Sequence, residues 1–192
     1  MSSTIDPAAA PNADALAALL APRSIAVVGA SRNAAHIGHE ILSNLIGFGF
    51  SGAVYPVNPR ASSICSVHAH RTIGDVPEAC DMAGIVVPKE QVLDIAEACG
   101  AAKVRGLVVI SAGFREIGGD GVDREARLME IVRRHGMRMI GPNCMGVVNT
   151  DPAVSMNATF ATTMPPFGHA AFVSQSGALG LSVLDYAREY GI

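Results

Sequence analysis

Short apolar runs, separated by helical patterns and turns, recur five times along the chain, and this alternation constrains the fold more than any other feature. The runs span residues 24–29, 52–57, 82–87, 105–111 and 137–143. Continuous apolar runs, rather than alternating ones, are typical of parallel strands that helices cover on both faces. With 49% apolar and 16% charged residues, we expect an α/β fold with an open, doubly wound parallel sheet and right-handed crossovers.

The pattern loosens in the last quarter of the chain. Residues 148–168 are rich in Pro, Asn and Thr and predict a linker. Residues 169–192 predict one more strand, a tight turn and a helix. Because one βα unit cannot cover its own faces, we expect 14–147 to form a Rossmann-type domain and 169–192 to begin a second, flavodoxin-like domain. The alternative is a sixth strand of the first sheet. Residues 1–13 predict a flexible N-terminal arm.

Composition argues against several classes of protein. A net charge of −3 without a basic stripe argues against nucleic-acid binding. No apolar run approaches the ~20 residues that span a bilayer, and the N-terminus does not resemble a secretory signal. Two histidine pairs lack a third ligand at suitable spacing, so we expect no metal site. The cysteines form no CxxC pair, which favours reduced thiols and a cytoplasmic protein; they are Cys65, Cys80, Cys99 and Cys144.

Ligands of open α/β sheets collect at the carboxyl ends of the strands. In this sequence those ends contain small residues, prolines and polar groups, and no carboxylate. They read Gly29-Ala30-Ser31, Val57-Asn58-Pro59-Arg60, Val86-Val87-Pro88, Ser111-Ala112-Gly113 and Gly141-Pro142-Asn143. We therefore expect a carboxylate-free trough for an anionic ligand along this edge of the sheet.

The first of these loops predicts a nucleotide site but leaves the nucleotide open. Gly29 and Gly38 stand nine residues apart, and Ser31 replaces the middle glycine of GxGxxG. The following helix would offer free N–H groups to a phosphate. A dinucleotide site also needs an acid about 20 residues further on, where this chain has Asn58 and Arg60. An arginine there favours an additional phosphate near the ribose, which NADP and the 3′-phosphate of coenzyme A both supply.

Five motifs in order carry a family resemblance: YPVNP, IVVP, ISAGF, GPNCMG and SQSGALG. They resemble the coenzyme A-binding domain of the nucleoside-diphosphate-forming acyl-CoA synthetases, a family that includes the α subunit of succinyl-CoA synthetase. The likeness is closer to ADP-forming acetyl-CoA synthetases and to the large protein acetyltransferases that share the module. It extends from Ser24 to the last residue.

The resemblance implies that coenzyme A lies extended across the strand ends. It assigns the phosphates of the nucleotide to Gly29, Ala30, Ser31 and Arg32. It assigns the adenosine to Val57, Asn58, Pro59 and Arg60, with Arg60 near the 3′-phosphate. It places the adenine or the pantetheine arm beside Val87 and Pro88, the pantetheine on the backbone of Ser111, Ala112 and Gly113, and the thiol end near Asn143.

The SQSG turn resembles the helix N-terminus that holds a phosphate during catalysis in this family. The residues concerned are Ser174, Ser176, Gly177 and Ala178, and the free N–H groups of the last three supply the physical reason. The family also uses a downstream histidine and an ATP-grasp domain, whereas no histidine follows His169 here. The resemblance thus implies that this chain binds coenzyme A or acyl-CoA and holds no catalytic residue itself.

A downstream domain or partner subunit would then complete the enzyme, and we expect a homo-oligomer. Two other classes of function remain open from the sequence. One is a non-catalytic, regulatory coenzyme A-binding protein. The other is an NADP-dependent oxidoreductase or redox sensor.

Overall fold

A parallel five-stranded sheet forms the centre of the computed structural model, which describes residues 13–191. The strand order is β2-β1-β5-β6-β7, and every neighbouring pair is parallel. The bounds are β1 Ser24–Val28, β2 Ala53–Val57, β5 Met82–Ile85, β6 Gly106–Val109 and β7 Arg138–Ile140. The predicted α/β fold with a Rossmann-type parallel sheet is therefore confirmed.

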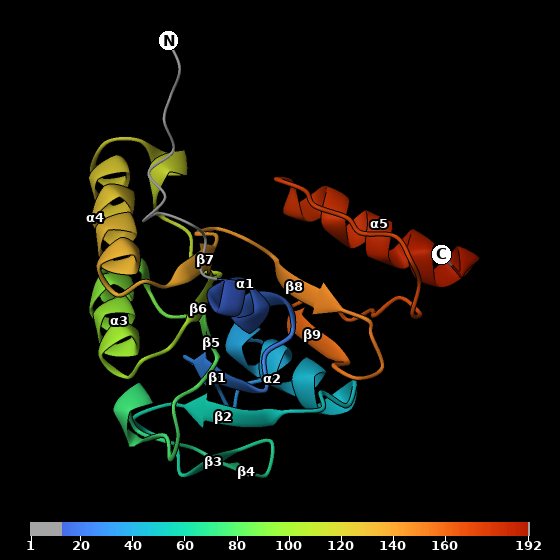
Figure 1. The fold of residues 1–192 in the computed structure, drawn as a ribbon, viewed down its shortest axis with the longest axis horizontal. Coiled ribbons are helices and arrows are strands. Elements are labelled where there is room, and N and C mark those ends of the chain that lie inside the picture. The colour runs from blue at the N-terminus through green and yellow to red at the C-terminus, as the bar shows by residue number, and fades with distance from the viewer. Residues whose placement is uncertain (1–12, 192) are drawn as a thin grey trace.

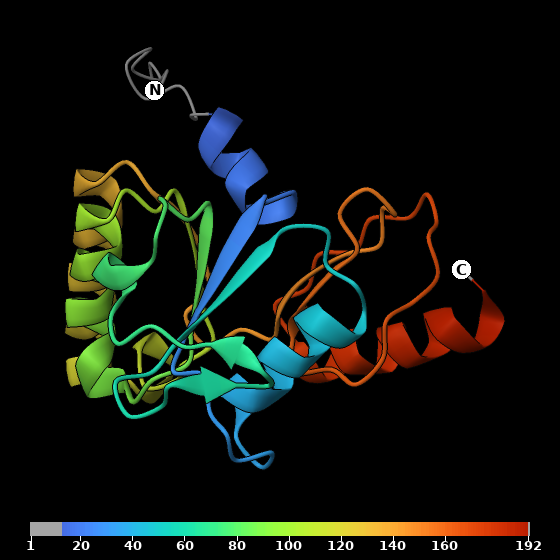
Figure 2. The same cartoon turned by 90° about the horizontal axis from the view of Figure 1, so that it is seen from below.

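Helices cover both faces of this sheet. Helix α2 (Ile37–Gly47) lies on one face, and α3 (Lys89–Ala101) and α4 (Asp120–Arg134) lie side by side on the other (Figures 1 and 2). In β1, Ala26 and Val28 belong to the core under α3 and α4, whereas Ile25 and Val27 belong to the core under α2. Because both faces are packed, all five residues of β1 are buried and the strand shows no polar alternation.

Shorter elements complete the layers. Helix α1 (Ala13–Leu20) packs against β6 and β7. Between β2 and β5 lie a small hairpin, β3 (Ser63–Ile64) with β4 (Val67–His68), and a 3-10 helix, η2 (Ile73–Asp75). A second 3-10 helix, η3 (Arg115–Ile117), precedes α4. None of the helices described here has the length and apolar character that crossing a membrane requires.

The predicted linker at 148–168 contains most of an antiparallel hairpin. Strands β8 (Gly146–Asn149) and β9 (Met156–Thr159) pair with each other, and β9 packs against α2. The buried amide of Asn44 in α2 donates to the carbonyl oxygens of Thr159 and Ala161, both at 2.8 Å. The interpretation as a linker did not anticipate that this polar stretch is held on the layer that covers the sheet.

The strand predicted within 169–174 is wrong. These residues form no strand and are exposed, whereas the predicted helix is present as α5 (Gly177–Tyr190). A strand needs a hydrogen-bonding neighbour, and none of the described strands pairs with this segment, so the alternative of a sixth strand in the sheet fails as well. The predicted arm lies outside the described residues except for Ala13, which begins α1. The division into two domains stays a prediction.

Asp81 ties together the amino ends of three strands. Its buried carboxylate accepts the N–H of Arg23 at 2.8 Å and a guanidinium N–H of Arg105, and its own N–H donates to the hydroxyl of Ser24 at 3.0 Å. Burial disfavours the ionised form, but the hydrogen bonds from Arg23 and Arg105 outweigh it and hold the pKa of Asp81 below its ordinary value. The ionised carboxylate therefore stabilises the edge of the sheet opposite the strand ends.

We predict that Asp81→Asn lowers the free energy of unfolding at pH 7 by about 1–3 kcal/mol, because it weakens hydrogen bonds to two arginines. The pKa of Asp81 in the folded protein lies below the unfolded value of about 3.9. The contribution of its carboxylate to the free energy of unfolding is therefore complete above that pH. It is lost as pH falls through the folded pKa. Denaturant unfolding at pH 7 and at pH 3 measures both effects.

Asp94→Asn, at an exposed position on α3, is the matched control and should leave stability nearly unchanged. Equal stabilities of Asp81→Asn and wild type at pH 7 would contradict the assignment.

Candidate functional site

Two glycines let three chain segments meet at the carboxyl ends of the strands. Gly29 has φ +97°, and a Cβ there would lie 2.4 Å from the carbonyl oxygen of Val86. A Cβ on Gly38, in the first turn of α2, would lie 2.2 Å from the carbonyl oxygen of Gly29. The first loop, the start of α2 and the end of β5 are therefore in backbone contact, which leaves a floor that a phosphate can approach closely.

The end of β2 is fastened to this first loop. Gly29 donates its N–H to the carbonyl of Val57 at 3.1 Å, and the Asn58 amide donates to the carbonyl of Ala30 at 2.7 Å. The Asn58 side-chain oxygen accepts the N–H of Arg60 at 2.8 Å. Asn58 thus shapes the turn that contains Arg60 and ties this turn to the first loop.

The two arginines at this end differ in whether their guanidinium groups form hydrogen bonds within the protein. Arg32 donates to the carbonyl of Ser63 at 3.0 Å and to the hydroxyl of Ser62 at 3.4 Å. Arg60 is exposed, and its guanidinium has no hydrogen-bond partner among the described residues. Of these two arginines, Arg60 is therefore the one whose guanidinium is free to meet a ligand.

A cavity of about 490 Å³ lies at the ends of β5, β6 and β7, against the start of α5. It is lined by Ile37, Val86, Val87, Ile110, Ser111, Ala112, Asn143, Cys144, Met145, Phe160, Gln175 and Gly177. Five of these were predicted site residues: Val87, Ser111, Ala112, Asn143 and Gly177. The fold thus brings residues of three strand ends together with the SQSG turn, which follows more than thirty residues after Asn143.

The remaining predicted residues lie outside this lining. The first-loop and β2-end residues form the neighbouring cluster described above, and Pro88 is exposed at the N-cap of α3. Seven lining residues were not predicted. Val86 adjoins a predicted residue, and Ile37 begins the helix after the first loop. Phe160 had no sequence signal, because the unforeseen β8–β9 hairpin delivers it to the cavity.

Asn143 lies in a tightly held loop. Its φ is +54°, and its N–H donates to the carbonyl of Ser111 at 3.1 Å. The thiol of the next residue, Cys144, donates to the carbonyl of Val109 at 3.3 Å. Burial raises the pKa of Cys144 to about 11, so the thiol is protonated at neutral pH and is a poor nucleophile.

A carboxylate reaches the loop after β6, which corrects the prediction of a carboxylate-free trough. Glu116 folds back from η3 and accepts the N–H groups of Gly113 and Phe114. Burial opposes its ionisation, but the hydrogen bonds from Gly113, Glu116 and Phe114, with the nearby charge of Lys89, lower its pKa. The Gly113 N–H, which the family resemblance assigned to pantetheine, is therefore bonded to Glu116. The Ser111 hydroxyl donates to the carbonyl of Val87 at 2.6 Å.

The SQSG turn caps α5. The Ser176 hydroxyl accepts the N–H of Leu179 at 3.3 Å, and the Ser176 N–H donates to the hydroxyl of Ser174 at 3.0 Å. One of the three N–H groups predicted to be free is therefore bonded to Ser174. Those of Gly177 and Ala178 lie in the first turn, where a helix leaves its N–H groups without intrahelical partners.

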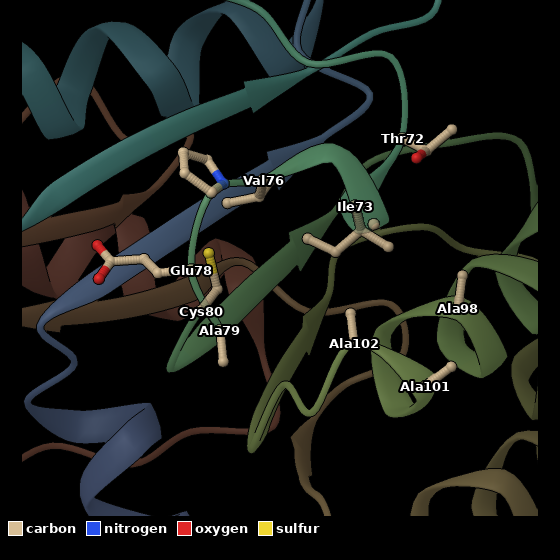
Figure 3. Close-up of a pocket in the computed structure, with 11 residues that line it drawn as sticks. Thr72, Ile73, Val76, Glu78, Ala79, Cys80, Ala98, Ala101 and Ala102 are labelled. Carbon is tan, nitrogen blue, oxygen red and sulfur yellow. The ribbon is translucent and has the colours of Figure 1, made fainter.

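A second cavity, of about 550 Å³, lies at the opposite edge of the sheet, where β5 begins (Figure 3). Segment 72–80 and the end of α3 line it with small apolar side chains such as Ile73, Ala98 and Ala102. Its carboxylate, Glu78, accepts the hydroxyl of Tyr55 at 2.7 Å, and this bond raises the pKa of Tyr55 to about 12. With a carboxylate and no cation in its lining, this cavity suits an anionic ligand less well than the strand ends do.

Residues 23–150 match the family model described as "CoA binding domain". The chain belongs to this family. The match confirms the predicted family and favours coenzyme A over NADP as the ligand of this domain.

Relatives support the same assignment over nearly the whole chain. The ADP-forming acetate–CoA ligase I of Archaeoglobus fulgidus is 42% identical over 91% of this chain and 25% of its own length. The α subunit of the ADP-forming acetate–CoA ligase II of Pyrococcus furiosus is 44% identical over 85% of this chain and 35% of its own length.

A solved structure agrees in fold. The dinucleotide-forming acetyl-coenzyme A synthetase 1 of Ca. Korarchaeum cryptofilum, in complex with phosphate and ADP, superimposes with a TM-score of 0.84 and 40% identity. The superposition covers 92% of this chain and 37% of the other. This coenzyme A-binding chain thus spans about a quarter to two fifths of the relatives it matches.

The two cavities can be distinguished with a matched pair of exposed alanines. We predict that Ala112→Phe, which fills the cavity at the strand ends, weakens coenzyme A binding at least about tenfold. Ala101→Phe, which fills the cavity at the opposite edge, should leave the affinity unchanged. Calorimetric titration of both variants is the measurement, and the reverse pattern would move the site to the other edge.

Proposed function

We propose that this chain binds coenzyme A or acyl-CoA as part of an ADP-forming acyl-CoA synthetase. The observation that carries the proposal is the shared cavity: Asn143, expected at the thiol end, and Gly177, in the turn expected to hold a phosphate, line the same space. A reaction that passes an acyl group from a phosphate to a thiol needs those two groups close together.

The order of the strands in space supports the expected pose. The family resemblance assigns the adenosine to the end of β2, the phosphates to β1, the adenine or the pantetheine to β5, the pantetheine to β6 and the thiol to β7. With the pantetheine at β5, this sequence follows the sheet order β2-β1-β5-β6-β7. Four steps of about 4.8 Å give an edge of about 19 Å for an extended ligand. Each part of coenzyme A would therefore meet the next strand along the edge, without the chain doubling back.

The charges support the same direction along the edge. Arg60, whose guanidinium is unengaged, lies at the adenosine end, where the 3′-phosphate would bind. The glycine floor and the first turn of α2 would receive the pyrophosphate, since His36 does not cap that helix with its side chain. The thiol end would enter a cavity whose walls are mostly apolar.

The groups that catalyse the acyl-CoA synthetase reaction would lie outside the described residues of this chain. Among the described residues that line the cavity, Cys144 is the sole titratable side chain, and its raised pKa keeps it protonated. A general base, a phosphate carrier and an ADP site would come from a further domain or partner subunit. The similarity to a relative named an α subunit supports this division.

Titration of this chain with coenzyme A, dephospho-coenzyme A and NADP tests the ligand. We predict that coenzyme A binds and that NADP does not compete with it. Arg60→Ala should cost about 1.5–3 kcal/mol, or roughly 10- to 150-fold in Kd, because it removes a charge-assisted phosphate contact. Arg60→Ala should also lose the preference of the wild type for coenzyme A over dephospho-coenzyme A.

Arg133→Ala, at an exposed position in the last turn of α4, controls for the loss of one positive charge and should bind as the wild type does. Tight NADP binding without a coenzyme A signal would contradict the proposed function. Binding of coenzyme A that Arg60→Ala leaves unchanged would refute the role of Arg60 alone.

A further inference from the structure

The side chain of Met145, in the loop between β7 and β8, lies against the start of α5. A Cβ added at Gly180 would lie 3.3 Å from Cε and 3.5 Å from Sδ of Met145, and one added at Gly177 would lie 3.8 Å from Met145 Cβ. Gly177 and Gly180 are three residues apart and so share a helix face. Gly180 is buried, whereas the three residues before it are exposed. The two glycines thus form the surface on which Met145 sits.

The backbone around Met145 is fixed to the sheet. On one side, Asn143 and Cys144 bond to Ser111 and Val109. On the other side, Gly146 begins β8 and pairs with Thr159. Met145 is therefore a flexible, polarisable side chain on a rigid base, a residue type that fills irregular gaps between packed elements well.

Met145 also lines the cavity together with Asn143, Gln175 and Gly177. It thus touches both the space for the thiol end and the helix whose cap was assigned to a phosphate. The middle of α5 has a separate contact, a hydrogen bond of 3.0 Å from the Thr163 hydroxyl to Asp185. Met145 thus contacts the first turn of α5, whereas Thr163 bonds to a later turn of the same helix.

We propose that Met145 is a positioning residue that seats the start of α5 against the coenzyme A edge and couples the two. A ligand that fills the cavity packs against the Met145 side chain, restricts its motion and thereby fixes the first turn of α5. By linkage, a seated α5 strengthens binding of that ligand by the same factor. The identity of the ligand in this inference rests on the proposed function. The packing of Met145 against Gly177 and Gly180, which we call the seat of α5, is present without a ligand.

Amide hydrogen exchange of this chain tests the seat directly. In the absence of ligand, Met145→Ala should speed exchange of the amides from Leu179 to Val183 about tenfold, because truncation leaves a gap under Gly180. Met145→Leu, which refills the gap, should restore protection. Met129→Ala, at a half-buried methionine of α4, should have no effect on α5, and the amides of β1 report whether the fold is intact.

Coenzyme A and inorganic phosphate then test the coupling. Saturating coenzyme A should slow exchange in the first turn of α5 in the wild type and in Met145→Leu, but not in Met145→Ala. Phosphate should tighten coenzyme A binding in the first two proteins only. If the amides of α5 exchange at the wild-type rate in ligand-free Met145→Ala, Met145 does not position this helix. If coenzyme A slows their exchange equally in the wild type and both variants, Met145 does not couple the ligand to α5. Failure of the wild type to bind coenzyme A in calorimetry would instead contradict the proposed function.

Discussion

The backbone of Gly38 passes so close to the carbonyl oxygen of Gly29 that no side chain fits between them, and Gly29 approaches Val86 in the same way. These contacts join β1, α2 and β5 through bare backbone at the carboxyl edge of the sheet. Any Cβ at either glycine would sit 2.2–2.4 Å from a carbonyl oxygen, so the segments would have to separate. The floor of the proposed coenzyme A site therefore depends on two residues without side chains.

The sheet and much of the site follow from patterns that the sequence displays openly. Strands such as β1 are apolar throughout because helices cover both faces, and that pattern alone separates a parallel sheet from an antiparallel one. The strand ends carry Gly, Pro, Ser and Asn because chains turn there. Since parallel strands share one carboxyl edge, Val87, Ser111, Ala112 and Asn143 had to be neighbours. The helix of the SQSG turn was also predictable, from its serine cap.

Other parts depend on polar contacts, which hydrophobic periodicity does not report. Asn157 and Thr159 suggest a linker by composition, yet both are fully buried, because the Thr159 hydroxyl donates to Asn157 Oδ1 at 2.6 Å and Asn157 in turn binds the carbonyl of Ala161. Phe160 reaches the cavity only because this hairpin folds. Glu116 brings a carboxylate to a loop that was predicted to lack one, through hydrogen bonds from the backbone N–H groups of Gly113 and Phe114. No spacing rule specifies this contact.

The central claim is that coenzyme A lies along one edge of the sheet, with its nucleotide at β2 and its thiol at β7. A crystal structure of this chain with coenzyme A tests it most directly. The account predicts the 3′-phosphate within hydrogen-bonding reach of Arg60, the pyrophosphate over Gly29 and the sulfur beside Asn143. A ligand seated between η2 and the end of α3, or one running in the opposite direction along the strand ends, would contradict it.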